Sequence, residues 1–499
     1  MKKILCILLT LALLLPLAAC SEKGGNADEP ASQGSDGNAS SDGTPGAAEE
    51  EEDPMAKLYE DLPTGDYGGF VFSFLNNISN FAYTLMSAEE LTGEGINDAI
   101  YNRNAKVEEK LNIKIDEQLV GYSEVTSGMK AAITAGDDTY SSFWNEAGFV
   151  SSFGIEGSHL NVNEIASLNL AKPWWEGDAM KEIQVLDKLY YLVGDIHLMF
   201  KESFWMNGYN RSIIDQNQLE NPYDLVKEGR WTLDAMKSEM EVAAQDLNGD
   251  GVMDGEDRFG VTCYSGCAHA FYMAADEVLI TRNEEGIPVN VNPGDRFYSV
   301  VEKIVNTMFT KEAFNTYVCM SGVTKNIAQY QDEWHGVFLS GHALFYLEPI
   351  GSLKKLRDMD DEFGIVPFPK YDEAQENHIT YIATYAAMCG IPITNSDPER
   401  TGVILENLCA ESHGDLREAY VDTTLNFKYI RDEESKEMLN LILSTGRFNL
   451  CDLLGVSAVK DAVANAMSSG NADIASVIAK TMKVADKMLD KNLAKLLGE

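Results

Sequence analysis

One stretch near the start of the folded part limits what this chain can fold into. Residues 70–75 (FVFSFL) are apolar enough to form a buried strand, and residues 113–115 (IKI) form the next candidate strand. Between them, apolar side chains recur at helical spacing over residues 96–111. This strand–helix–strand order predicts α/β architecture. Asn77 lies at the carboxyl end of the first strand, where ligands collect in α/β folds, and is therefore a candidate ligand-binding residue.

The chain begins with the layout of an export signal. Two lysines are followed by an almost wholly apolar run over residues 4–19, and small residues lead directly into Cys20. Residues 17–20 (LAAC) resemble a bacterial lipobox, in which the cysteine is acylated and becomes the new N-terminus. The alternatives are a plain secretory signal or a membrane-spanning helix, but the apolar run is shorter than the ~20 residues that a span needs. We expect residues 1–19 to be a signal peptide and Cys20 to carry a lipid anchor on the extracellular face of the cell membrane.

The segment after Cys20 differs in composition from the rest of the chain. Residues 21–54 are rich in Gly, Ser, Ala, Asn and Asp, so they bury too little apolar surface to offset the entropy of ordering. We expect residues 20–56 to be a disordered linker that gives the folded body reach. The formal net charge of the chain is −40, and removal of the two signal lysines makes it −42. Such an acidic body repels nucleic acid and anionic lipid headgroups, which argues against binding to either and leaves the lipid as the membrane anchor.

The cysteines leave three possibilities open. Cys6 is removed with the signal, and Cys20 is the acylated residue. An even number remains, so disulfides are possible in an exported protein, a metal pair at Cys263 and Cys267 is possible, and buried thiols suit a large core. The remaining cysteines are Cys263, Cys267, Cys319, Cys389, Cys409 and Cys451.

The sharpest chemical motif is the segment 246–257, DLNGDGVMDGED. Oxygen-bearing side chains fall at the loop positions that a calcium-binding loop uses, and Gly251 lies where such a loop turns sharply. Asp257 stands where a glutamate is usual, and its shorter side chain disfavours bidentate coordination. A turn cluster without an ion is the alternative. We expect one structural calcium, held by Asp246, Asn248, Asp250, Asp254, Asp257 and the Val252 carbonyl.

Further segments complete the predicted organisation. Residues 188–196 are typical of a strand that passes from one lobe to another, and residues 344–348 and 363–368 form further strands. Apolar residues step by threes and fours over residues 474–496, which predicts a long helix packed on the body or, alternatively, lying on a membrane surface.

The chain resembles the extracellular solute-binding proteins of ABC importers, in particular the sugar-binding-like lipoproteins of the family 1 type. Each matching motif is loose by itself, but their order and spacing are fairly specific. Asp195 and the strand before it also match. The other matching stretches are residues 17–20, 229–260, 338–348, 363–370 and 422–439.

The resemblance implies a two-lobe, periplasmic-binding-protein-like α/β fold (type II-like), with hinge strands and a ligand cleft. The first lobe is expected over residues 57–196 plus 385–429, and the second over residues 197–384 plus 430–499. The implied function is capture of a carbohydrate, expected to be an oligosaccharide, by lobe closure. Permease subunits of the importer are the implied partners.

A sugar site combines aromatic walls with a few fixed hydrogen-bonding groups. Core packing is the alternative role of each candidate, since large aromatic side chains are mostly buried. The aromatic candidates are Trp144, Trp205, Tyr264, Trp334 and Tyr385, and the hydrogen-bonding candidates are Asn77, Asp195 and Glu348.

The main competing class is an enzyme, such as a surface glycoside hydrolase. It would need two carboxylates at a fixed separation, and with 79 acidic residues the sequence selects no pair. The seven histidines are scattered and form no metalloprotease pattern, and the chain has no nucleophile elbow. We therefore predict a binding protein without catalytic residues. Two further classes compete with a sugar-binding importer component, namely a peptide-binding importer component and a surface adhesion or scaffold protein.

Overall fold

The predicted strand–helix–strand unit opens the folded body. Its elements are β1 (Phe70–Asn77), α2 (Gly95–Leu111) and β2 (Ile113–Val120). β1 and β2 pair in parallel, with Phe70 opposite Ile113, so the α/β prediction is confirmed. The structure, a computed structural model, describes residues 54–79, 82–263, 266–309, 317–319, 334–425 and 433–498. The segment Leu58–Glu499 forms one compact unit.

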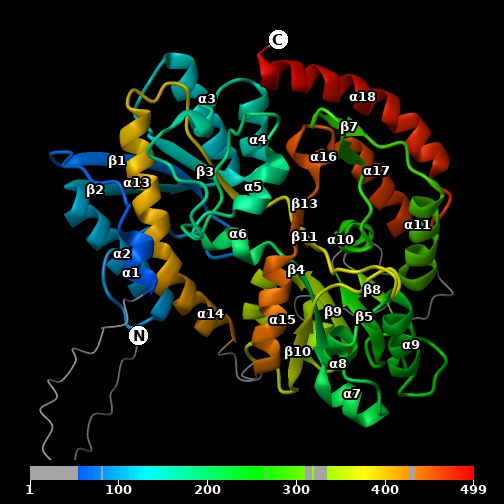
Figure 1. Ribbon diagram of the computed structural model, residues 1–499. Coiled ribbons are helices and arrows are strands. Elements are labelled where there is room, and N and C mark those ends of the chain that lie inside the picture. Colours follow the sequence, from blue (N-terminus) through cyan, green and yellow to red (C-terminus); the bar gives the residue numbers. More distant parts are fainter. Residues whose placement is uncertain are drawn as a thin grey trace, which may run out of the picture. The chain divides into compact units, whose positions relative to one another are not determined.

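The first sheet has four strands in the order β12–β3–β1–β2 (Figure 1). The central strands are covered by α3 and α4, while α13 and α14 pack against α2. The other elements of this part are α1 (Pro54–Tyr59), α3 (Tyr122–Ala135), β3 (Ser142–Glu146), α4 (Ala147–Ile155), η1 (Val162–Glu164), α5 (Gly177–Ile183), β12 (Ala387–Gly390), α13 (Pro398–Glu411), η4 (Ser412–Leu416) and α14 (Arg417–Leu425).

The second sheet has five strands in the order β10–β4–β9–β5–β8. Helices α9 and α12 pack on β5 and β9, and α15 packs on β10. The strands are β4 (Trp205–Asn210), β5 (Phe259–Cys263), β8 (Tyr317–Cys319), β9 (Ala343–Pro349) and β10 (Phe363–Val366). The remaining elements are α7 (Arg211–Asn217), α8 (Pro222–Lys227), α9 (Leu233–Ala243), α10 (Cys267–Ala274), β6 (Ile280–Arg282), β7 (Pro288–Asn290), α11 (Asp295–Met308), α12 (Trp334–Leu339), η3 (Ile350–Leu356) and α15 (Glu433–Ser444).

We call the elements around these two sheets the first and second lobes. The chain passes between them through α6 (Leu198–Glu202) and again between β11 (Thr380–Ile382) and β12. β11 pairs in parallel with β13 (Gly446–Phe448). The predicted strand over residues 188–196 is not a regular strand and makes only isolated bridges, such as that between Leu192 and Cys389. The exact residue limits that we expect for the lobes stay a prediction.

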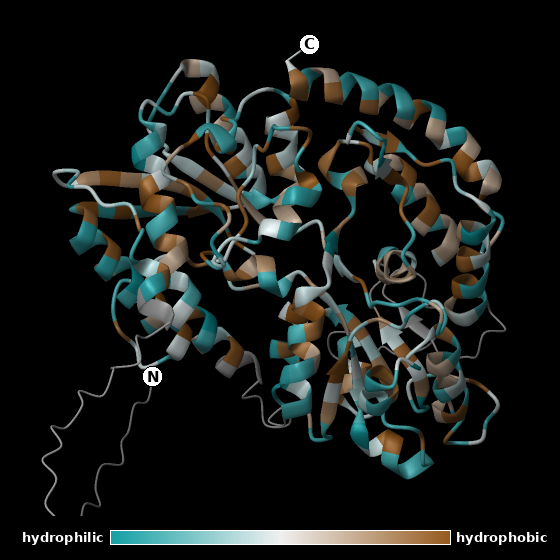
Figure 2. Cartoon of the chain, in the orientation of Figure 1, coloured by the Kyte–Doolittle hydropathy of each residue, from teal (hydrophilic) through white to brown (hydrophobic). Residues whose placement is uncertain are grey.

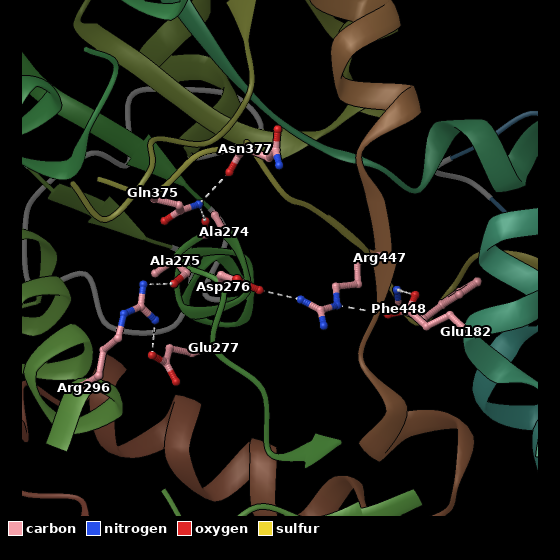
Figure 3. Close-up of polar contacts among 10 residues, drawn as sticks. All are labelled: Glu182, Ala274, Ala275, Asp276, Glu277, Arg296, Gln375, Asn377, Arg447 and Phe448. Carbon is pink, nitrogen blue, oxygen red and sulfur yellow. Dashed lines mark hydrogen bonds and ion pairs between the residues drawn. The ribbon is translucent and has the colours of Figure 1, made fainter. Parts of the chain in front are cut away.

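A polar network surrounds β13, and we call it the crossing network (Figure 3). The guanidinium of Arg447 donates to the Glu182 carboxylate on α5 at 3.0 Å and to the Asp276 carboxylate after α10 at 2.7 Å. The second oxygen of Glu182 accepts the Phe448 N–H at 3.1 Å. Nearby, Arg282 donates to backbone carbonyls of residues 182 and 184. The network therefore ties α5, β13 and the end of α10 together.

The last three helices contact elements of both lobes. They are α16 (Leu450–Leu453), α17 (Ser457–Ser468) and α18 (Ala475–Leu497). α16 packs on α4, whereas α18 packs on α17, α4 and β7. Figure 2 shows hydrophobic and hydrophilic residues alternating along α18. Its buried stripe confirms the prediction that this helix packs on the body: Ile478, Ala485, Leu489, Leu493 and Leu496.

Two further findings bear on the sequence-based expectations. Cys389, Cys409 and Cys451 are buried free thiols, and the buried Cys263 and Cys267 have their sulfur atoms 3.3 Å apart. Within the described ranges, no helix has both the length and the apolar character needed to cross a membrane. Cys20 and the side chain of Cys319 lie outside what the structure describes.

Candidate functional site

A cavity of about 730 Å³ opens where the two lobes and the crossing segments meet. The first lobe contributes Ser79 and Glu146, and the crossing segment after β11 contributes Thr384 and Tyr385. The second lobe and α17 supply most of the remaining wall. Its other side chains are Trp205, His269, Trp334, His335, Glu348, Ser352, Lys355, Tyr381, Lys460, Asp461, Asn465 and Ser468.

Aromatic side chains form much of the cavity wall. Trp205 is the first residue of β4, and its ring stacks on Tyr381 of β11 with the centroids 6.4 Å apart. Trp334 begins α12, is half-buried, and donates its indole N–H to Glu348 of β9 at 2.6 Å. That hydrogen bond fixes the indole plane, so the cavity has a preformed flat surface beside polar groups.

Several polar atoms of the cavity have no partner among the residues that the structure describes. They include the indole nitrogen of Trp205 and Nδ1 of His269, which are buried and make no hydrogen bond there. Leaving a buried polar group unpaired costs roughly 1–3 kcal/mol. A ligand that offers hydroxyl groups would remove this cost, because a hydroxyl both donates and accepts.

The ionisable side chains of the cavity wall differ in whether they have ion-pair partners. Lys460 pairs with Asp452 at 3.0 Å and with Asp461 at 2.8 Å. Burial lowers the pKa of His269 and of His335 to about 3, so both imidazoles are neutral at pH 7. Burial raises the pKa of Glu146, and no charged neighbour in the described part of the chain contributes to that shift.

The segment 246–257 folds into a series of tight turns. Asp246 accepts the N–H groups of Gly249 and Gly251, and both glycines have positive φ, as the predicted loop requires. Asp257 is fully buried and accepts the N–H groups of Leu247 and Asp254. In the described part of the chain, no group of three or more His, Cys, Asp or Glu side chains is arranged to hold a metal ion. The calcium site therefore stays a prediction.

No protein-family model matches the sequence, and no curated protein matches it. Solved structures do match. The sugar-binding protein MalE of the phytopathogen Xanthomonas citri has a TM-score of 0.58 at 12% identity, over 86% of this chain and 100% of its own. UspC of M. tuberculosis has a TM-score of 0.56 at 12% identity, over 84% and 100%. The ABC substrate-binding protein Lmo0181 of Listeria monocytogenes, solved with cycloalternan, has a TM-score of 0.52 at 11% identity, over 86% and 99%.

The chain has the two-lobe fold of these solute-binding proteins. The predicted fold class is thereby confirmed, and the Xanthomonas and Listeria neighbours are described as binding proteins. At this level of identity the likeness concerns the fold, so the role of each side chain has to be argued from the cavity itself.

The structure brings four of the predicted site residues together in the cavity of this two-lobe fold. They are Trp205, Trp334, Glu348 and Tyr385. Tyr264 lies outside the described residues. The assignment of these side chains to ligand binding stays a prediction.

Three other predicted residues lie away from the cavity lining. Trp144 is 1% exposed on β3, with its ring 5.4 Å from that of His197. Asn77 is fully buried at the end of β1, and its amide has no hydrogen-bond partner among the described residues. Asp195 is 5% exposed and pairs with His413 at 2.6 Å and Lys201 at 3.4 Å.

Sequence reasoning missed a larger set of cavity residues. Glu146 lies two residues after Trp144 on the same strand, so attention to the strand end would have found it. Tyr381 is an aromatic residue four positions before Tyr385, so the argument that selected Tyr385 could also have selected Tyr381. Lys460 and Asp461 carried none, because α17 reaches the cavity only through the packing of the C-terminal helices.

Proposed function

We propose that this protein is the solute-binding component of an ABC importer and that it captures a carbohydrate, specifically an oligosaccharide, by closure of its two lobes. The observation that carries the proposal is the cavity between the lobes. There Trp205, Trp334, Tyr381 and Tyr385 lie beside polar atoms that lack partners among the described residues. Sugars offer apolar C–H faces to aromatic rings and hydroxyl groups to such atoms. The fold shared with the cycloalternan-bound Listeria protein supports the same conclusion.

Lobe closure is supported by the positions of the cavity residues, which come from both lobes. Glu146 faces the cavity from the first lobe, whereas Trp205 and Trp334 face it from the second. A ligand that contacts both walls has more contacts in a closed state than in an open one, and this difference shifts the population toward closure. Permease subunits of the importer would then recognise the closed form.

The test is a screen of the chain from Ser21 onward by thermal shift, with neutral and acidic oligosaccharides, monosaccharides, peptides and polyamines. We expect a rise in melting temperature with oligosaccharides and no turnover of them. Hydrolysis of a bound glycan would replace the proposal with a glycoside hydrolase. A response to peptides alone would keep the importer role and remove the sugar.

We propose the lipid anchor at Cys20 on the basis of the signal layout. Two acyl chains on one cysteine suffice for stable membrane attachment, whereas one chain is marginal. The protein would then act on the extracellular face of the membrane. Mass spectrometry of the mature N-terminus tests this, and an unmodified terminus or cleavage at another residue would contradict it.

We also propose a structural calcium in the loop 246–257. The four carboxylates proposed as ligands lie within one short loop and repel one another unless a cation neutralises them. A carboxylate oxygen that accepts one N–H retains a lone pair for a cation, so the backbone hydrogen bonds of Asp246 and Asp257 are compatible with binding. Binding requires the side chains to turn toward one centre.

A further inference from the structure

The cavity contains one cation that no described group of the protein neutralises. Lys355 lies on η3 and lines the cavity, and it makes no ion pair or hydrogen bond with any residue that the structure describes. The other lining lysine, Lys460, is held by Asp452 and Asp461. Glu348 lines the same cavity and accepts hydrogen bonds from Trp334 and Ser352, but it forms no ion pair with Lys355.

Two further basic residues flank Lys355 in the sequence, while the cavity lining also contains the carboxylates of Glu146, Glu348 and Asp461. Lys354 precedes it and Arg357 follows two residues later, in a chain with 39 basic and 79 acidic residues. The charge of Lys355, after burial, contributes to lowering the pKa of the neighbouring His335. Glu202 is the carboxylate that interacts electrostatically with Lys354. Burial raises the pKa of Glu202 to about 7, so at neutral pH it carries only part of a negative charge and balances the charge of Lys354 incompletely.

Glu146, the unpaired carboxylate of the opposite wall, is in a different situation. No described cation contributes to its pKa shift, so Lys355 and Glu146 do not neutralise each other in this arrangement. A sugar hydroxyl can donate to an isolated carboxylate and satisfy it. The unpaired ammonium group of Lys355, beside aromatic rings, is satisfied by an anion, because exclusion of water strengthens the attraction.

We propose that the captured carbohydrate is acidic and that a carboxylate of the sugar binds the ammonium group of Lys355. This inference rests on the proposed function and names the class of its ligand. The carboxylate would lie at the η3 side of the cavity, while neutral hydroxyl groups reach Glu146 and the nitrogen atoms of Trp205 and His269. The net negative charge of the protein repels an acidic sugar. The attraction of Lys355 for the sugar carboxylate would therefore be local, and it would favour acidic over neutral sugars at this site.

The test compares acidic, neutral and basic trisaccharides by titration calorimetry with the chain from Ser21 onward. The ligands are the trisaccharide of galacturonic acid, its methyl ester and a glucosamine trisaccharide, with neutral glucose and mannose trisaccharides as references. We expect the acid to bind at least about tenfold more tightly than its ester, and salt to reduce this difference. Lys355→Met should abolish the preference, and Lys355→Arg should retain it. Lys436→Met, an exposed position on α15, is the matched control.

The outcomes separate the inference from the proposed function. Equal binding of acid and ester, unchanged in Lys355→Met, would overturn the inference while leaving carbohydrate capture in place. A preference for the glucosamine trisaccharide that is lost in Glu146→Gln would also overturn it, in favour of a cationic sugar. Absence of binding for every saccharide would overturn the proposed function as well. Melting curves of the ligand-free variants show whether each one is folded.

Discussion

The crossing network and the cavity differ in how completely their polar groups are paired. Around β13, Arg447 and Glu182 have ion-pair and backbone partners on three elements (Figure 3). In the cavity, Nε1 of Trp205, Nδ1 of His269 and the charge of Lys355 have no partner among the described residues. Paired groups contribute to the stability of the fold, whereas unpaired groups cost stability that a ligand can recover. The comparison assigns stability to the first region and binding to the second.

The largest effect is expected at an unpaired carboxylate outside both regions. Glu239 on α9 is 6% exposed, neither oxygen has a hydrogen-bond partner in the described structure, and burial raises its pKa to about 8. The folded state therefore holds the proton more tightly than the unfolded state. This contribution is fully present below pH ~4.5 and is lost as the pH rises through ~8. Between pH 5 and pH 9 the wild-type free energy of unfolding should therefore fall through ionisation of Glu239, and Glu239→Gln should abolish about 3 kcal/mol of this fall.

Urea unfolding at the two pH values measures this change. Glu241→Gln, on the exposed side of the same helix, is the control and should leave the pH dependence unchanged. If Glu239→Gln instead destabilised the protein equally at both pH values, unpaired polar groups would not be costly here. The contrast between the two regions would then lose its physical basis.

The next effect concerns the loop 246–257. Its carboxylates accept hydrogen bonds from backbone N–H groups, as the Glu182 carboxylate of the crossing network does. Calcium bound only by the folded state should stabilise it by about 2.7 kcal/mol at a hundredfold excess over its dissociation constant. EDTA should therefore lower the melting temperature, and added calcium should restore it. The double variant Asp250→Asn/Asp254→Asn should not respond. An unchanged melt in EDTA, with no metal on the purified protein, would refute the site.

Replacement of Arg447 tests the crossing network itself. Arg447→Met leaves the Glu182 carboxylate, whose pKa burial already raises, without its ion-pair partner, and we expect a loss of about 2 kcal/mol in the free energy of unfolding. Arg230→Met removes exposed ion pairs with Glu220 and Glu228, and its effect on that free energy should be much smaller because solvent screens those charges. Equal losses in the two variants would show that the network is no more than a surface feature.

The sequence predicted the framework of the molecule better than its cavity. Apolar periodicity located β1, β2, β9 and α18, because burial against one neighbour leaves a local pattern. The cavity depends on which distant segments meet. Trp144 and Trp205 looked equivalent in sequence, yet one packs beside His197 and the other lines the cavity. Lys355 and Asp461 became visible only when the fold brought η3 and α17 to the cavity that Tyr381 of β11 also lines.

The most direct test of the account uses Trp334, which is half-buried, lines the cavity and belongs to no part of the crossing network. Titration calorimetry with the oligosaccharide that gives the largest thermal shift should show one site on the wild-type chain. In Trp334→Ala the affinity should fall by about tenfold or more, while the loss of the hydrogen bond to Glu348 lowers the melting temperature without ligand but leaves the variant folded. Unchanged affinity in Trp334→Ala, or failure of the wild-type chain to bind any oligosaccharide, would contradict carbohydrate capture in this cavity.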